Sequence, residues 1–351
     1  RKDGLALDQV NIIFEKSPGL YYVGSDEGGI NIISNRIVGR MRFNTDLKRN
    51  GIRDICFVNQ NEIWIGSYRG ILIKRGINEK LLNRDTGLPS DDVRRIYKDS
   101  QNRIWVGTRS AGLIRFKNDT IEKIFDLKSG LSTNYILSVE EDQNGLIWVG
   151  TNGGGLISID KNDQLKYYNP FKDDASGILI FNIHVDDINA LWLATNIGIF
   201  YFENKEFRQV ELASNYQNDT FFDIVSDDVG NLWITSNIGL YRIRISDARE
   251  FLNGQTEQIP SFLYDHNDGM SNKECTGATR LLRASDGKLW IPTLGGVAII
   301  DPDELLTNEF KPPVIITDFL TDRSGEFISE DLKAGKLVLE PGNFRYQIRY
   351  T

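Results

Sequence analysis

The sequence predicts an all-β protein made of seven similar sheets, and three observations lead to this prediction. All six tryptophans fall in similar segments, and Tyr22 opens a seventh segment of the same kind. Each segment reads as a short apolar strand, a glycine turn and a second strand, as in LIWVGTNGGGLISID at 146–160. The steps between successive anchors are 42, 41, 43, 44, 41 and 57 residues. A period near 40 built from short strands is typical of a radial repeat, so we predict a seven-bladed β-propeller. The anchors are Tyr22, Trp64, Trp105, Trp148, Trp192, Trp233 and Trp290.

Several positions around the anchors repeat because backbone geometry restricts them. A residue that tolerates a left-handed backbone precedes every anchor by three positions, as a tight hairpin requires. These are Gly19, Asn61, Asn102, Gly145, Asn189, Gly230 and Gly287. Six residues before four anchors stands an aspartate that we expect to close the turn by accepting backbone N–H bonds: Asp99, Asp142, Asp186 and Asp227. Every anchor is followed three residues later by Ser or Thr, and then by a Gly-aliphatic pair.

Each repeat is expected to supply four strands separated by turn residues. In the third repeat they are 93–97, 104–108, 113–116 and 121–125, and in the first 10–15, 20–24, 30–33 and 37–43. The seventh repeat offers only 279–284, 289–293 and 297–300, after an insertion at 246–260. Residues 3–10 resemble the loop that follows an outer strand at 86–93. We therefore expect sequence upstream of Arg1 to provide the seventh outer strand and to cover the open edge.

The tryptophans share one strand position, so we expect them to fill the space between adjacent blades. Cys56 and Cys275 lie in different repeats, and we expect no disulfide between them. Hydrophobic residues make up 40% and charged residues 26% of the 351 residues, which is ordinary for a globular protein. The net charge of −8 argues against a nucleic-acid partner. No run of about 18 apolar residues occurs, and the start at Arg1 suggests a piece of a longer protein.

The repeat pattern stops after 302, which divides the chain into a propeller at 1–302 and a second region at 303–351. Lys311, Pro312 and Pro313 read as a stiff linker. Strand patterns follow at 314–320, 336–339 and 344–350. This tail is shorter than the roughly 100 residues of a β-sandwich, so we interpret it as the beginning of an Ig-like β-sandwich.

Two segments, 87–116 and 130–160, resemble the two-component regulator propeller repeat. Residues 268–302 are similar to the closing repeat of such sensors, and 336–351 to the start of their Ig-like domain. The family pattern is modified at Tyr22, Ala194 and Thr235. The resemblance implies the periplasmic sensory part of an inner-membrane receptor, acting as a homodimer. It also implies that a small molecule or oligosaccharide binds, and that the Ig-like domain passes the signal to a cytoplasmic histidine kinase or diguanylate cyclase.

Two other functions stay open: a propeller enzyme acting on polysaccharide and a passive scaffold for protein assembly. The acidic pairs Asp186-Asp187 and Asp227-Asp228 fall in the repeated turns, so we interpret them as turn caps rather than glycosidase carboxylates. His184 lies on an inner strand and is expected to belong to the core. We expect no catalytic residue, metal or cofactor in this region, and no direct contact with the membrane.

The loops between second and third strands vary where the opposite turns stay constant, and loops on a rigid scaffold commonly carry function. We therefore predict the ligand site there. Arg69 and Arg109 could grip one carboxylate or sulfate by bidentate bonds, with Tyr68 as an aromatic plane beside them. The alternative interpretation is that these residues are solvated loop tips. The predicted ligand-binding residues are Asp26, Glu27, Tyr68, Arg69, Arg109, Asn152, Asn196 and Asn237.

Overall fold

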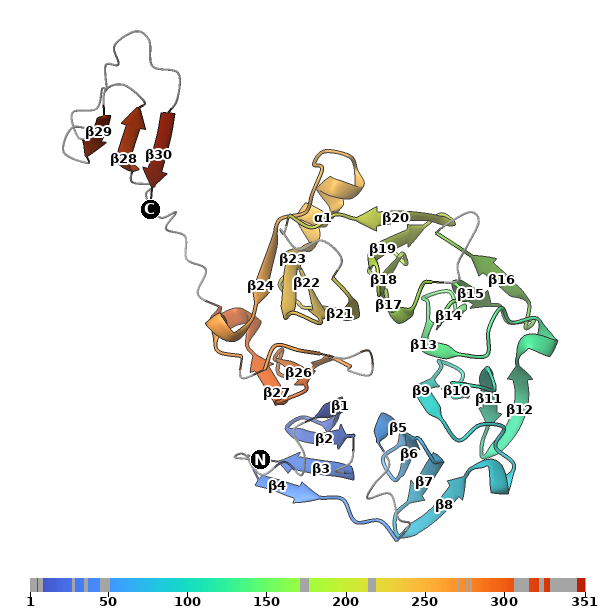
Figure 1. Cartoon of the computed structure of the whole chain (residues 1–351). Helices are drawn as coiled ribbons and strands as arrows, with labels where there is room; N and C mark the ends of the chain where they lie inside the picture. Colours follow the sequence, from blue (N-terminus) through green and yellow to red (C-terminus); the bar gives the residue numbers. More distant parts are fainter. Residues whose placement is uncertain are drawn as a thin grey trace. The chain divides into compact units, whose positions relative to one another are not determined.

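The chain forms a seven-bladed β-propeller, as the repeats predict (Figure 1). The computed structural model describes residues 5, 9–26, 29–34, 37–44, 51–170, 177–213, 219–270, 272–275, 277, 280–305, 316–321, 325–328 and 346–350. Two compact units divide the chain, Arg1–Asp303 and Glu304–Thr351. The propeller lies in the first unit. Within the described ranges no helix is long and apolar enough to cross a bilayer.

Blades 1 to 6 are four-stranded antiparallel sheets whose strands follow chain order from the axis outward. Blade 1 contains β1 (Val10–Ser17), β2 (Leu20–Ser25), β3 (Gly29–Ser34) and β4 (Ile37–Arg40). Blade 2 contains β5 (Ile52–Asn59), β6 (Glu62–Ser67), β7 (Gly70–Arg75) and β8 (Asn78–Leu82). Blade 3 contains β9 (Val93–Lys98), β10 (Ile104–Thr108), β11 (Leu113–Lys117) and β12 (Thr120–Phe125).

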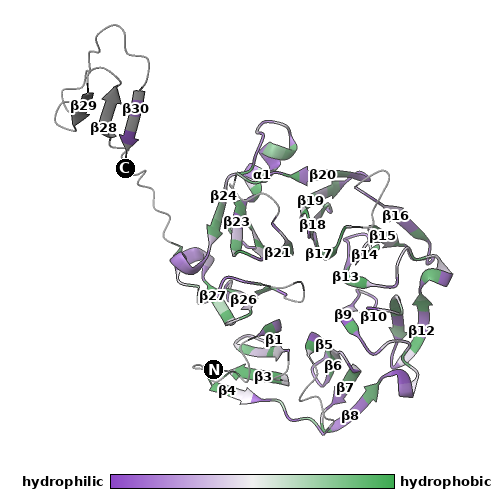
Figure 2. Cartoon of the chain, in the orientation of Figure 1, coloured by the Kyte–Doolittle hydropathy of each residue, from purple (hydrophilic) through white to green (hydrophobic). Residues whose placement is uncertain are grey.

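The next three blades repeat this order. Blade 4 contains β13 (Ile136–Glu141), β14 (Ile147–Thr151), β15 (Leu156–Ile159) and β16 (Leu165–Tyr168). Blade 5 contains β17 (Ile180–Val185), β18 (Leu191–Thr195), β19 (Gly198–Glu203) and β20 (Glu206–Val210). Blade 6 contains β21 (Phe221–Ser226), β22 (Asn231–Ser236), β23 (Leu240–Arg244) and β24 (Ser261–Tyr264). The ring contains both hydrophobic and hydrophilic residues in its blades (Figure 2), and second strands such as β14 are buried along their whole length.

Blade 7 has three described strands, β25 (Leu282–Arg283), β26 (Leu289–Thr293) and β27 (Gly296–Ile300). The inner strand is shorter than the expected 279–284. No strand in the described part of the chain pairs with the outer side of β27, and an upstream outer strand stays a prediction. The insertion after β23 forms α1 (Ile245–Leu252), an eight-residue helix whose Ala248 is buried.

Short 3-10 turns and a second sheet complete the described elements. The turns are η1 (Arg84–Thr86), η2 (Leu127–Ser129), η3 (His266–Asp268) and η4 (Pro302–Glu304). In the second unit, β28 (Ile316–Thr321) pairs antiparallel with both β29 (Gly325–Ile328) and β30 (Tyr346–Tyr350). The expected strand at 336–339 lies outside the described residues.

The predicted turn residues form a repeated closure at the hairpins between first and second strands. The Gly or Asn before each anchor has a positive φ, between 62° and 88°, in six blades. The prediction is wrong for Asn61, which is not in the left-handed region. Asp99 shows the role of the aspartates: its Oδ1 accepts the N–H groups of Gln101 at 3.0 Å and Arg103 at 2.8 Å. Asp142, Asp186 and Asp227 accept equivalent bonds.

The hydroxyl after each anchor closes the next loop, at the opposite end of the blade. In all seven blades its Oγ donates to the carbonyl of the glycine at or just before the start of the third strand, as from Thr151 to Gly155 at 2.7 Å. At Gly112, φ is 76° and a Cβ would lie 2.0 Å from the Phe125 carbonyl oxygen. These constraints hold the second-to-third loops rigidly.

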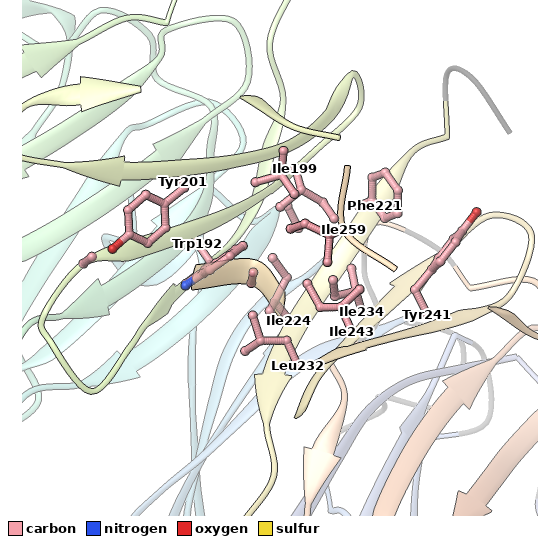
Figure 3. Packing of buried hydrophobic residues seen from close by; sticks show 14 residues of the cluster. Trp192, Ile199, Tyr201, Phe221, Ile224, Leu232, Ile234, Tyr241, Ile243 and Ile259 are labelled. Carbon is pink, nitrogen blue, oxygen red and sulfur yellow. The ribbon is translucent and has the colours of Figure 1, made fainter. Parts of the chain in front are cut away.

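The core lies between blades, and the prediction that the tryptophans fill this space is confirmed for five of the six: Trp64, Trp105, Trp148, Trp192 and Trp290. Trp192 of blade 5 packs with Phe221, Ile224 and Leu232 of blade 6 in one buried cluster (Figure 3). Equivalent clusters place Trp64, Trp105 and Trp148 against the blade that follows each of them. The ring closes in the same way, since Trp290 of blade 7 stacks on Tyr21 of blade 1 with ring centroids 4.0 Å apart. Cys56 and Cys275 are buried free thiols.

Candidate functional site

A bulge at the start of each of six inner strands builds the end of the propeller where the predicted site residues lie. In blade 2, Ile52 pairs with Ser67 and Asp54 with Gly66, which leaves Arg53 as the extra residue. A β-bulge interrupts the alternation of side chains and re-aims the inserted one. The inserted residues are Asn11, Arg53, Arg94, Leu137, Phe181 and Phe222. They are polar or cationic in blades 1 to 3 and apolar in blades 4 to 6.

Around the two inserted arginines, a chain of alternating arginine and tyrosine side chains crosses blades 2 to 4. The guanidinium carbons of Arg53 and Arg94 lie 5.3 and 5.5 Å from the centroid of the Tyr68 ring. Arg94 and Arg109 flank the Tyr135 ring in the same way, at 5.4 and 5.7 Å. Cation–π contacts of this length are attractive, so they stabilise the packing of the guanidinium groups against the tyrosine rings. We call these five residues, together with Asp92, the Arg–Tyr cluster.

Asp92 fixes the middle of the Arg–Tyr cluster. Its carboxylate faces Arg94 with two short contacts, 2.9 Å to Nε and 3.0 Å to Nη2. The Arg94 Nη2 contact is a hydrogen bond, whereas Arg94 Nε and Asp92 Oδ1 lie close together without hydrogen-bond geometry. A charge-assisted bond of this kind orients the guanidinium as well as neutralising it. Arg109, which also contacts Tyr135, has its Nη1 3.7 Å from Asp92 Oδ2. Its side chain is more exposed than that of Arg94. Asp92 therefore forms ion pairs with both Arg94 and Arg109.

Arg53 has no comparable partner. Its Nη1 donates to the Tyr68 hydroxyl at 3.1 Å, and its Nε is buried without a hydrogen-bond partner. Among the described residues it makes no ion pair within 4 Å. Burial lowers the pKa of the Arg53 guanidinium, and the positive charge of Arg94 acts in the same direction. Tyr68, Asp26 and Asp92 oppose this effect on the pKa, and Asp26 Oδ1 accepts a bond from Asn11 Nδ2 at 3.2 Å.

The other half of this end is covered by the segment that leads into β25. Phe181 and Phe222 stack edge to face at 5.3 Å, and both are buried. A Cβ on Gly277 would lie 2.6 Å from the Phe181 ring, so the backbone of this segment runs directly against it. The covered half therefore leaves the Arg–Tyr cluster as the accessible side, where 39% of Tyr68 is exposed.

Arg280, in the same segment, crosses the axis and joins blades. Its guanidinium donates to the carbonyls of Phe181 at 3.1 Å and Leu137 at 3.2 Å, and Nη1 lies 3.9 Å from an Asp223 carboxylate oxygen. Its backbone N–H donates to the Asn11 carbonyl at 3.1 Å. Burial raises the pKa of Asp223 to about 6. Burial also lowers the pKa of Arg280, so both members of this pair carry a desolvation cost.

The predicted site residues fall into three groups. Tyr68 and Arg109 belong to the Arg–Tyr cluster; Arg69 is exposed beside Tyr68, outside this chain of contacts. Asn196 is used locally, because its side chain accepts from Leu179 N and donates to Gly177 O. Asn237 likewise accepts from the Thr220 N–H at 3.2 Å. Asn152 bonds through its backbone to the Tyr135 carbonyl, Asp26 holds Asn11, and Glu27 lies outside the described residues.

Sequence reasoning missed Arg53, Arg94 and Tyr135. The two arginines follow the first residue of an inner strand, in IRDI at 52–55 and VRRI at 93–96. A prediction from the alternation of side chains along a regular strand ignores the bulge, so it cannot give the direction of these two side chains. Comparing this one position across all seven repeats would have revealed the contrast between polar and apolar blades.

Comparison with known proteins supports the repeat and the fold. Residues 87–110 and 130–153 match the family model described as two component regulator propeller. No curated protein sequence matches the chain. Among solved structures, the extracellular domain of the hybrid two-component system BT3049 from B. thetaiotaomicron is similar, with a TM-score of 0.73 and 22% identity. That alignment covers 92% of this chain and 42% of the other.

The extracellular domain of BT4673, from the same organism, aligns with a TM-score of 0.70 and 18% identity, over 84% of this chain and 38% of the other. The chain thus spans about two fifths of the length of these two structures. A virginiamycin B lyase from Staphylococcus aureus has a TM-score of 0.56 at 16% identity, over 76% of this chain and 86% of the other. The shared fold is the β-propeller.

Proposed function

We propose that this chain is the ligand-sensing propeller of a bacterial transmembrane signalling receptor and works outside the cytoplasm, in the periplasm. The match of residues 87–110 and 130–153 to the two component regulator propeller carries the proposal. Fold similarity to the extracellular domains of two hybrid two-component systems supports it. The ligand is a small molecule or oligosaccharide that binds at the Arg–Tyr cluster.

The output lies outside this chain. In the proposed receptor, two copies of the propeller pass the ligand state through an Ig-like domain that begins in the region 303–351. A cytoplasmic histidine kinase or diguanylate cyclase then responds. A ligand shifts such an equilibrium only by its difference in affinity between the two states. The rigid second-to-third loops favour this role, because a preformed site loses little conformational entropy on binding.

Binding fits the Arg–Tyr cluster better than catalysis. Glycoside hydrolysis uses two carboxyl groups on either side of the bond that breaks. Asp92 is the carboxylate bonded within the cluster, and Arg94 and Arg109 already occupy it. Within the described ranges, no group of three or more His, Cys, Asp or Glu residues could hold a metal ion. The enzyme alternative rests on fold similarity to a propeller enzyme, the virginiamycin B lyase.

A thermal-shift screen of the propeller with its second unit tests the sensing function. A compound that binds only the folded protein stabilises it by RT ln(1 + [L]/Kd), or about 2.7 kcal/mol at one hundred times Kd. We expect at least one oligosaccharide or small metabolite to raise the melting temperature without being consumed. Turnover of a stabilising polysaccharide would favour the enzyme instead. A complete screen without stabilisation would favour the scaffold.

A further inference from the structure

Arg53 is a partly buried cation with no carboxylate oxygen within 4 Å among the described residues, and the charges of Asp26 and Asp92 act on it from farther away. Each of the other two arginines in the Arg–Tyr cluster lies within 4 Å of Asp92, whereas Arg53 has a tyrosine hydroxyl as its polar partner. Its Nε is shielded from solvent and donates to nothing. A buried donor left without an acceptor is costly, and more so when it belongs to a charged group. The protein as a whole carries a net charge of −8, so this local excess of positive charge is not a general property of its surface.

The position of this cation suits a ligand from solvent. Arg53 is the inserted residue of the bulge in β5, so the backbone rather than a flexible loop sets its direction. Its guanidinium packs against the Tyr68 ring and donates to the Tyr68 hydroxyl. Because 39% of Tyr68 is exposed, a ligand from solvent can reach this side of the guanidinium. The segment around Gly277 covers Phe181 in the opposite half of this end.

We infer that Arg53 binds the anionic group of the ligand, and that the ligand carries a carboxylate or a sulfate next to a ring that lies against Tyr68. This inference rests on the proposed sensing function and names the chemical class of its ligand. A guanidinium presents its N–H groups in a planar fork that matches two oxygens of a carboxylate or sulfate. The guanidinium carbon of Arg94 lies 5.5 Å from the Tyr68 ring centroid, and a hydrogen bond from its Nη2 to Asp92 at 3.0 Å fixes its position.

Simple aromatic ions test this inference without knowledge of the natural ligand. Benzoate and benzenesulfonate are the anionic probes, and benzamide is the neutral probe of the same shape as benzoate. NMR titration of the arginine Nε–H signals reports binding, with the Arg53 signal assigned by its loss in Arg53→Gln. We expect both anions to shift this signal with a millimolar Kd and benzamide to leave it in place. Arg53→Gln should weaken binding of the anions, followed through the remaining signals, by at least about tenfold, as for loss of a charge-assisted bond.

Three further variants separate the chemistry from damage to the fold. Tyr68→Phe keeps the ring and should retain binding of benzoate, whereas Tyr68→Leu should weaken it severalfold. Arg249→Gln removes an exposed arginine of α1, paired with Asp187, and should leave binding unchanged. Melting curves matching that of the wild type show that each variant is folded.

The inference is overturned if benzamide binds as well as benzoate, if Arg53→Gln retains wild-type affinity, or if neither anion binds in the millimolar range. These outcomes are distinct from failure of the proposed function. If neutral compounds alone stabilise the protein, the sensing function is retained and the inference of an anionic ligand is rejected. Binding of benzoate with no change in receptor output would keep the anion site and remove its role in sensing.

Discussion

Asp99 links the hairpin of blade 3 to the core between blades, so its replacement by alanine should destabilise the ring. Its side chain is fully buried. One oxygen, Oδ1, accepts the backbone N–H groups of Gln101 and Arg103 at 3.0 and 2.8 Å. The other, Oδ2, accepts Trp105 Nε1 at 2.8 Å and Arg103 Nε at 2.6 Å. One aspartate thus serves the turn and the tryptophan together.

The magnitude follows from the donors that Asp99→Ala leaves behind. Trp105 is 1% exposed, so its indole N–H would stay buried without an acceptor, at a cost of about 1–3 kcal/mol. The two backbone donors lie at a turn that water reaches, and each loses a bond worth about 0.5–1.5 kcal/mol. We therefore expect a total loss of about 2–6 kcal/mol in the free energy of unfolding. Asp99→Asn should cost less, because its remaining oxygen still accepts the turn bonds.

Equilibrium urea unfolding, followed by fluorescence and circular dichroism together, measures this loss. Blade 7 supplies the matched control, because Ala284 stands where the aspartate would be and Trp290 Nε1 has no partner. Trp105→Phe should cost about 1–2 kcal/mol more than Trp290→Phe, since only the first breaks an indole hydrogen bond. A loss below 1 kcal/mol for Asp99→Ala, or equal losses for the two Trp→Phe variants, would refute this reasoning.

Three further predictions concern packing, pH and signalling. Trp148→Ala, between blades 4 and 5, should cost about 3–5 kcal/mol in urea unfolding; a loss under 1 kcal/mol would show that this tryptophan is not core. Because burial raises the pKa of Asp223 to about 6, the folded state holds a proton there between about pH 4 and 6 that the unfolded state has released. The wild type should therefore lose stability relative to Asp223→Asn as pH rises through this window, and a constant difference would contradict it. Replacing Pro312 and Pro313, which lie outside the described residues, with glycine should weaken signalling in the whole receptor without changing ligand affinity; unchanged output would exclude a stiff linker.

The sequence by itself determined the number of blades and, within a few residues, the strands of blades 1 and 3. Positions such as Gly145, Asp142 and Thr151 satisfy backbone requirements within a few residues of Trp148. The hydroxyl returns in all seven repeats, the left-handed residue in six and the aspartate in four. Local constraints of this kind can be recognised in one sequence, because the hydrogen bonds join residues that are only a few positions apart. The spacing of the anchors also placed the tryptophans between blades. The insertion at 246–260 could be located but not assigned a shape, and it contains a two-turn helix that packs on the core.

The Arg–Tyr cluster was decided by the tertiary structure. Tyr68 and Arg109 could be named as loop residues, but a bulge turns Arg53 and Arg94 toward them, and alternation along a strand cannot show a bulge. Arg280 depends still more on the closed ring, since its guanidinium bonds to Leu137, 143 positions away in sequence. Which side chains meet across the axis is fixed only when seven blades close on one another, because contacts between distant repeats leave no local pattern in the chain.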